Sequence, residues 1–167
     1  EYSETGVKNL FAAGAVTGFG GSGGFTWACL IADHVCELVK DMESEKFDAE
    51  QLKHIDETRN WVFAPLGRKT EYQVYPMELE DYIKHVNLNY IGVHKITSKM
   101  QRAVELIKFA KEGAVPLLVA SNHHELMRAI EVQHIIEISE LHAQSSLLRD
   151  ESRLVPVHFR EEYPDLN

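Results

Sequence analysis

Basic residues, cysteines and long apolar runs are all scarce in this 167-residue sequence. It has 17 basic against 26 acidic residues and a net charge of -9. This balance argues against binding to the backbone of nucleic acids, because surfaces that bind phosphates are basic. No apolar run approaches the ~20 residues that a membrane-spanning helix needs. The hydrophobic fraction of 44% is that of an ordinary globular protein, which excludes disorder for most of the chain.

An initial methionine and a signal peptide are also lacking, since the chain begins Glu1-Tyr2-Ser3. We therefore expect a piece of something larger, such as a processed product or one part of a longer chain.

The two cysteines, Cys29 and Cys36, lie seven residues apart in an apolar helical pattern. On a helix this spacing corresponds to a rise of about 10.5 Å, whereas a disulfide needs Cα atoms within roughly 7 Å. The sequence predicts two reduced, packed thiols and a cytoplasmic location.

Glycine is concentrated at the start of the chain, with seven of the ten glycines in the first 24 residues. The apolar run Asn9–Ala13 predicts a short buried strand, and Gly18–Gly24 predicts an irregular loop. Apolar residues at helical spacing then predict a helix over Thr26–Asp41. We take residues 1–45 as one segment with the order strand, glycine loop, helix.

Residues 46–149 read as a helical domain. Capping and helix-breaking signals predict helices over the ranges Asp48–Phe63, Pro76–Asn89, Ser98–Gly113 and Asn122–Arg149, with Pro65–Gly67 as a break. In the last helix the predicted core stripe is Leu126, Met127, Ile130, His134, Ile138, Leu141, Ser145 and Leu148. Amphipathic helices with short connections predict a mainly α fold with a small antiparallel bundle. Residues 150–167 read as an extended tail.

The glycine-rich loop is the first candidate site. Glycines before a helix bring bare N–H groups close to a ligand, and the helix N-terminus favours partial negative charge. Neither GxGxxG nor GxxxxGKS is present, so the two specific phosphate-binding patterns fail. The uncharged aromatic start Phe25-Thr26-Trp27 favours a planar ligand. A flexible link or a tight packing site remains the alternative.

Two further candidates are weaker. Glu131 and His134 have the i, i+3 spacing of a carboxylate-bridged metal site, but a second copy is lacking, and ordinary core-edge and surface histidines explain the pattern better. The arginines of Arg149–Arg153 and His158–Pro164 could clamp a carboxylate or fix a docking arm through ion pairs. No Ser/His/Asp set can be assembled, so catalytic residues stay unknown.

Three stretches together resemble a known family. Leu10–Gly14, followed by a glycine loop and an apolar helix, is similar to the last flavin-binding segment of the fumarate reductase/succinate dehydrogenase flavoprotein family. The tail, Glu151-Ser152-Arg153 followed by His158–Pro164, resembles the "ESR…HYRxDYP" ending of that family. His124–Ala129 resembles the "HELMRAWE" stretch of adenylylsulfate reductase alpha subunits, and Ser22–Thr26 resembles their "SGSFTEGR" junction.

The resemblance implies the C-terminal portion of an FAD-dependent oxidoreductase subunit. It implies contacts to the flavin from the backbone of Ser22, Gly23, Gly24 and Phe25, with Gly14 ending the preceding strand. It also implies two partners, namely the rest of the flavoprotein and an iron–sulfur electron-transfer subunit.

The sequence departs from the family at the ligand-binding positions. Ala15 replaces the glutamate that follows "AAG", and Gly18–Gly24 contains neither the histidine nor the arginine of its relatives. The GxGxxG module for the ADP half of FAD is not in this chain, so tight FAD binding requires the missing N-terminal part. A non-catalytic helical interaction domain that has lost the flavin machinery is the second hypothesis.

Overall fold

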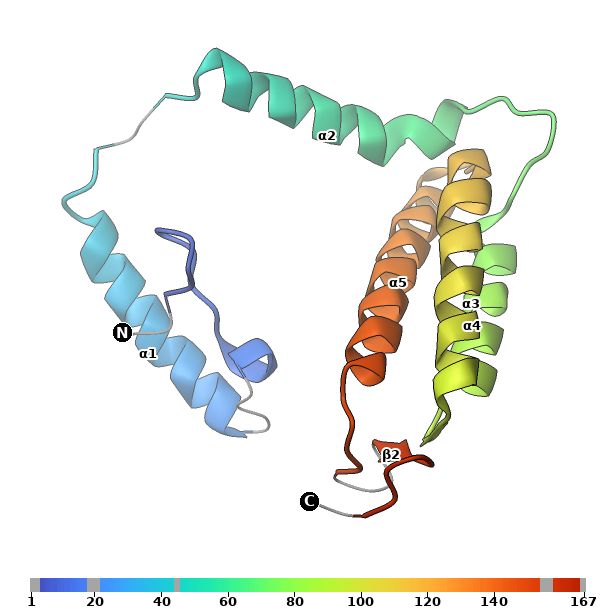
Figure 1. The fold of residues 1–167 in the computed structure, drawn as a ribbon. Helices are drawn as coiled ribbons and strands as arrows, with labels where there is room; N and C mark the ends of the chain where they lie inside the picture. Colours follow the sequence, from blue (N-terminus) through green and yellow to red (C-terminus); the bar gives the residue numbers. More distant parts are fainter. Residues whose placement is uncertain (1–3, 18–21, 44–45, 154–157, 166–167) are drawn as a thin grey trace. The chain divides into compact units, whose positions relative to one another are not determined.

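The computed structural model describes residues 4–17, 22–43, 46–153 and 158–165 (Figure 1). It divides into two compact units, Glu1–Asp48 and Ala49–Asn167. Within the described residues the chain forms five α-helices and one two-stranded sheet, which confirms the mainly α prediction. None of the helices in these ranges is both long and apolar enough to cross a membrane.

The first unit contains a 3₁₀ turn, η1 (Gly14–Thr17), and the helix α1 (Ser22–Val39). The predicted strand at Asn9–Ala13 is reduced to a single antiparallel bridge between Glu4 and Phe11. A two-stranded pairing is marginal without further strands, and Leu10 is 54% exposed rather than buried. The strand prediction was therefore wrong in its extent and its burial.

Helix α1 begins four residues before the predicted start at Thr26, so Ser22–Gly24 belong to the helix. Glycine costs least at this point, because the first-turn N–H groups make no intrahelical hydrogen bonds. The remainder of the predicted loop, residues 18–21, lies outside the described residues.

Both cysteines of α1 are free and exposed. The expectation of packed thiols was wrong, because among the described residues of this unit only η1 and the short segment before it pack against α1 and bury a narrow stripe of the helix. Ile31 lies in that stripe and is 5% exposed, while Leu30 is 53% exposed.

The second unit opens with α2 (Ala49–Gly67), which continues through the proline that was predicted to end it. A proline inside a helix removes one hydrogen bond and clashes with the preceding turn. Packing offsets this cost: Pro65 is buried, and its carbonyl accepts a hydrogen bond from the Ala120 N–H at 2.9 Å. The helix ends two residues later at Gly67.

The bundle consists of α3 (Pro76–Tyr90), α4 (Thr97–Phe109) and α5 (His123–Leu147), which pack against one another (Figure 1). A π-helical turn, η2 (Ala110–Ala114), and a 3₁₀ turn, η3 (Val115–Leu117), follow α4. The most deeply buried core side chains come from all three helices and from Leu118: Ile83, Val86, Met100, Ile107, Leu118, Val132 and Ile136.

The α5 helix buries a different face from the one predicted. Its buried residues are Leu126, Ala129, Val132, Ile136, Ser139, Ala143 and Ser146. Four of these seven are alanine or serine, which lets α3 and α4 approach closely, since interaxial distance depends on the side chains at the contact. The predicted stripe selected large residues such as Ile138 and Leu141, which are 66% and 62% exposed.

The start of α5 agrees with the sequence. Asn122 is the N-cap, and its Oδ1 accepts the Glu125 N–H at 3.0 Å. The Glu125 carboxylate accepts the Ser121 N–H at 2.7 Å, and this backbone hydrogen bond lowers the pKa of Glu125. The start predicted at Pro76 for α3 is likewise confirmed.

The start of α4 is capped from a distance. The predicted capping box of Ser98 and Gln101 does not form, because Ile96 occupies the N-cap position. Instead the Thr97 N–H donates to Glu162 Oε1 of the C-terminal tail at 2.6 Å.

The C-terminal tail (residues 150–153 and 158–165 of the described chain) was predicted as extended coil, but it forms a small sheet. Strand β2 (Phe159–Arg160) pairs in parallel with β1 (His94–Lys95), which precedes α4. The Glu161 N–H donates to the Lys95 carbonyl at 3.1 Å. Two-residue strands carry no sequence signal, because period-2 alternation needs a longer run.

We expect Glu162→Ala to lower the free energy of unfolding by about 1 kcal/mol or more, because it removes the cap of α4 and the ion pair with the buried Arg160. The Thr97 N–H holds the pKa of Glu162 below its usual 4.5. The stabilisation is therefore present above about pH 4.5 and is lost as the pH falls further. Urea unfolding at several pH values measures it. Glu161→Ala is the matched control, and equal losses in both variants would contradict the cap.

Candidate functional site

Gly14 stands where the apolar segment turns into η1. Its φ of +77° is a left-handed backbone conformation that favours glycine. A Cβ added there would meet nothing within 4 Å, so the backbone rather than the space requires glycine. Thr17 Oγ1 donates to the Gly14 carbonyl at 2.7 Å and closes the turn.

The other four predicted flavin-contact residues form the first turn of α1. Ser22, Gly23, Gly24 and Phe25 are its first four residues, and the N–H groups at such positions have no intrahelical acceptor. The helix dipole adds partial positive charge at this end. Gly24 is buried, whereas Phe25 is 77% exposed. This turn thus offers donors to an acceptor atom and an apolar ring beside them.

The candidate metal residues have other partners. Arg128 donates to Glu131 Oε2 at 3.1 Å, and the ring of His134 lies 6.3 Å from that of Trp61. In the part of the chain that the structure describes, no three or more His, Cys, Asp or Glu side chains gather as a metal site would require.

The tail arginines fix the tail to the bundle. The Arg160 guanidinium donates to the carbonyls of Ser146 at 2.9 Å and Arg149 at 2.8 Å, and to Thr97 Oγ1 at 2.8 Å. It also lies 5.2 Å from the centre of the Tyr163 ring. Arg149 pairs with Glu151. Arg160 therefore holds the tail against the bundle, as in the docking-arm alternative, but mainly through hydrogen bonds to backbone carbonyls and Thr97 rather than through ion pairs.

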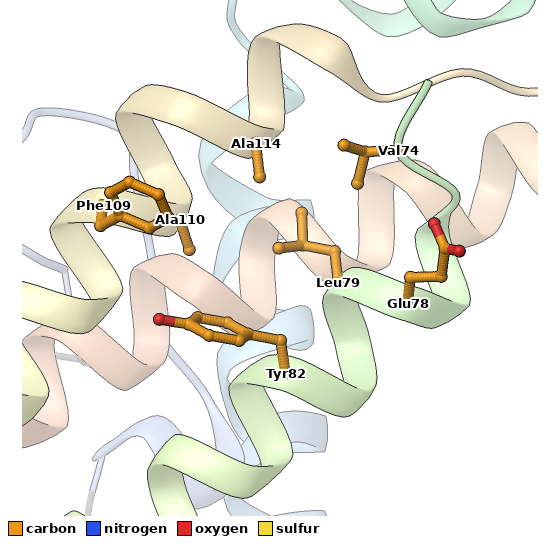
Figure 2. A pocket seen from close by; sticks show the side chains of 7 residues that line it. All are labelled: Val74, Glu78, Leu79, Tyr82, Phe109, Ala110 and Ala114. Carbon is orange, nitrogen blue, oxygen red and sulfur yellow. The ribbon is translucent and has the colours of Figure 1, made fainter. Parts of the chain in front are cut away.

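A pocket of about 250 Å³ lies between α3 and the π-helical turn η2 (Figure 2). Leu79 and Tyr82 of α3 face Ala110 and Ala114 across it, and Phe109 stands at one side. Tyr82 Oη donates to the Leu106 carbonyl at 3.4 Å, and burial raises the pKa of this phenol. The lining is apolar apart from the Tyr82 hydroxyl and Glu78, so it suits an apolar group rather than catalysis.

A second pocket, of about 330 Å³, lies between the N-termini of α3 and α5. His124, Glu125 and Arg128 line it, and all three belong to the "HELMRA" segment. Arg128 forms ion pairs with Glu80 and Glu131. No local pattern in the sequence predicts a site at these residues, because the charge pairing that joins α3 to α5 is a long-range contact.

Glu80 of α3 is the carboxylate that connects the ion pairs of α3 and α5. Its carboxylate accepts a hydrogen bond from Lys84 and pairs with Arg128, and these two cations lower its pKa. The carboxylates of Glu80 and Glu131 thus balance the charge of Arg128. Because Glu80 lies on α3 and Arg128 on α5, this ion pair links the two helices.

Comparison with known proteins identifies a family and a relative that are similar to this chain. The family model described as "Fumarate reductase flavoprotein C-term" matches residues 80–167, which is more than half of the chain. The L-aspartate oxidase of Acinetobacter baylyi is 25% identical over 169 residues, covering 98% of this chain and 29% of the relative.

Solved structures give the same grouping. Adenylylsulfate reductase from Archaeoglobus fulgidus superposes with a TM-score of 0.75 at 25% identity, over 87% of this chain and 25% of that one. The Mycobacterium smegmatis Sdh1 complex matches with a TM-score of 0.76 at 21% identity, over 95% of this chain and 28% of that one, and shares the fold. The chain spans less than a third of the length of each of these relatives.

Proposed function

Because the chain belongs to the fumarate reductase flavoprotein C-terminal family, we propose that it is the C-terminal portion of an FAD-dependent oxidoreductase subunit. The oxidoreductase would be of the adenylylsulfate reductase or fumarate reductase type. The main support is the extent of the alignment with the L-aspartate oxidase. It covers 98% of this chain, so the glycine-rich segment as well as the bundle has a counterpart in that relative.

The residues of the first turn of α1 fit a flavin. The carbonyl oxygens on the pyrimidine edge of a flavin are hydrogen-bond acceptors, and this turn supplies N–H groups that have no intrahelical acceptor. The exposed ring of Phe25 adds an apolar surface beside them. FAD, when bound, would supply the electron-transfer chemistry. The role of Ser22–Phe25 would be to hold and orient it, while the remainder of the flavoprotein binds its ADP half.

The direct test uses the complete flavoprotein that contains this chain. We expect it to purify with the visible absorption of a bound flavin, or to acquire this absorption when FAD is added. A complete protein that stays colourless and takes up no FAD would refute the proposal.

A sharper test removes a single donor. Ser22→Pro deletes the N–H of the first helical residue, at the position where helices tolerate proline best. We expect the complete flavoprotein carrying it to bind FAD about 5- to 10-fold more weakly, the value of roughly one hydrogen bond. Ser22→Ala keeps the N–H and is the matched control. Equal FAD affinity in the two variants would show that this amide does not contact the flavin.

The helical unit would provide a docking surface for the rest of the flavoprotein and for an iron–sulfur electron-transfer subunit. Exposed apolar residues on α5 and at its C-cap support this: Ile138 and Leu141 are 66% and 62% exposed, and the C-cap residue Leu148 is 85% exposed. Exposed apolar patches commonly mark interaction sites. The free thiols Cys29 and Cys36 support a cytoplasmic setting, where cysteines stay reduced.

The second candidate is a non-catalytic interaction domain. It is favoured by Ala15, which stands where the resemblance expects a glutamate, and by the lack of histidine and arginine among residues 18–24. The flavin measurement separates the two candidates, because the interaction domain takes up no FAD in the complete protein.

A further inference from the structure

Three side chains with basic nitrogens are buried where the C-terminal tail meets the bundle. The residues concerned are Lys95, His158 and Arg160, which are 2%, 6% and 2% exposed. Lysine and arginine are almost never fully buried without partners. The Arg160 guanidinium donates to four acceptors, the carbonyls of Ser146 and Arg149, Thr97 Oγ1 and the Glu162 carboxylate, and Lys95 Nζ donates to the Gly92 carbonyl at 3.0 Å.

His158 differs from the other two. Its backbone carbonyl accepts the Arg153 N–H at 2.9 Å, but its Nε2 is buried and has no hydrogen-bond partner among the described residues. A neutral imidazole can carry its hydrogen on Nδ1 and so leave Nε2 as an unpaired acceptor, whereas an imidazolium must bury an unpaired Nε2–H that carries part of a positive charge. The second arrangement costs far more.

The cations around His158, like its burial, disfavour the protonated form of the side chain. Three cations face it from three elements: Arg149 after the end of α5, Lys95 on β1 and Arg160 on β2. The facing anion is Glu151 of the tail. His142 on α5 also faces Lys95, so a proton on it would add to the positive charge. Burial, then these cations, hold the pKa of His158 below its usual 6.5.

His158 belongs to a connected set of tail contacts. Ser152 Oγ accepts the Arg160 N–H at 2.8 Å and donates to the Tyr163 carbonyl at 2.5 Å. Glu162 caps α4, and β2 pairs with β1. All these contacts are made by a few consecutive residues of the tail. If the His158 side chain leaves its buried position, all of them are therefore disturbed.

We propose that the C-terminal tail is a pH-sensitive latch, which is docked on the bundle while His158 is neutral and is released when that side chain takes up a proton. In the released state His158 faces water and regains its ordinary affinity for a proton. The docked state therefore loses stability as the pH falls below about 6.5. Release would uncover the N-terminus of α4 and the C-terminal carbonyls of α5.

The latch does not depend on flavin binding. Its pH dependence can be distinguished from that of the Glu162 carboxylate by the pH range in which each occurs. The Glu162 carboxylate contributes stability above about pH 4.5 and loses it below that value. Weakening of the tail between about pH 6.5 and 5 consequently belongs to a histidine.

Hydrogen exchange of the tail amides tests the latch. The reporters are the amides of Thr97, Arg160 and Glu161, with the core of α3 as the internal reference. After correction for intrinsic exchange, we expect their protection to fall by up to about tenfold per pH unit between about pH 6.5 and 5. His158→Gln, which stays neutral, should remove this slope, while His85→Gln on the exposed side of α3 should keep it.

A titration of His158 by nuclear magnetic resonance makes the test decisive even if the glutamine variant docks poorly. A pKa below 6.5 in the native chain supports the latch. A pKa at or above 6.5, or tail protection that stays constant from about pH 7.5 to 5, would overturn it.

Discussion

Arg160→Ala is expected to lower the free energy of unfolding of the chain by about 3–5 kcal/mol. The side chain is 2% exposed, and its guanidinium serves the carbonyls of Ser146 and Arg149 as well as Thr97 Oγ1. Alanine leaves these acceptors without a donor, and each unpaired buried group costs about 1–3 kcal/mol. Urea unfolding followed by circular dichroism measures the loss.

Arg160→Lys should fall between the parent chain and the alanine variant, because one ammonium group cannot reproduce the planar fork of a guanidinium. The control is Arg102→Ala on α4, whose side chain is 58% exposed and pairs with Glu105 one turn away. That variant should leave the unfolding midpoint almost unchanged. Equal shifts for Arg160→Ala and Arg102→Ala would show that the tail contacts do not stabilise the fold.

Ile136→Ala is expected to cost about 2–5 kcal/mol, whereas Ile138→Ala, two residues further along α5, should change the stability by about 0.5 kcal/mol or less. Ile136 is 1% exposed in the bundle core, and Ile138 is 66% exposed. Deleting the side chain of Ile136 opens a cavity among packed neighbours, while Ile138 has few neighbours to lose.

The isoleucine pair is a matched experiment, because residue type, helix and helix propensity are the same. Thermal and urea unfolding of both variants give the two free energies. The core stripe predicted from the sequence contains Ile138 and lacks Ile136. A larger loss for Ile138→Ala would restore that stripe and contradict the orientation of α5.

The local signals in the sequence were enough for several helix starts. Pro76 opens α3 and Asn122 caps α5, as predicted, because each signal acts within a few residues of the helix that it begins. The start of α4 was misassigned for the opposite reason. Its cap comes from Glu162, which is 65 residues away in the chain.

The family resemblance, rather than the residue pattern, implied flavin contacts at Ser22–Phe25. The structure puts these residues in the first turn of α1 and not in a loop. That they contact FAD stays a prediction. The pockets beside Tyr82 and Arg128 had no local signal, since their walls come from different helices.

The sequence by itself determined the mainly α composition, the family and the helix starts that have local caps, because propensity and capping are short-range effects. Only the tertiary structure decided which face of α5 is buried, since close packing with α3 and α4 selected small side chains such as Ala129 and Ala143 over larger ones. It also decided that α2 runs through Pro65, whose cost is offset by burial and by the contact to Ala120. The burial of Lys95 and Arg160 was likewise decided by the tertiary structure, because residues far apart in the chain create the environment of both side chains.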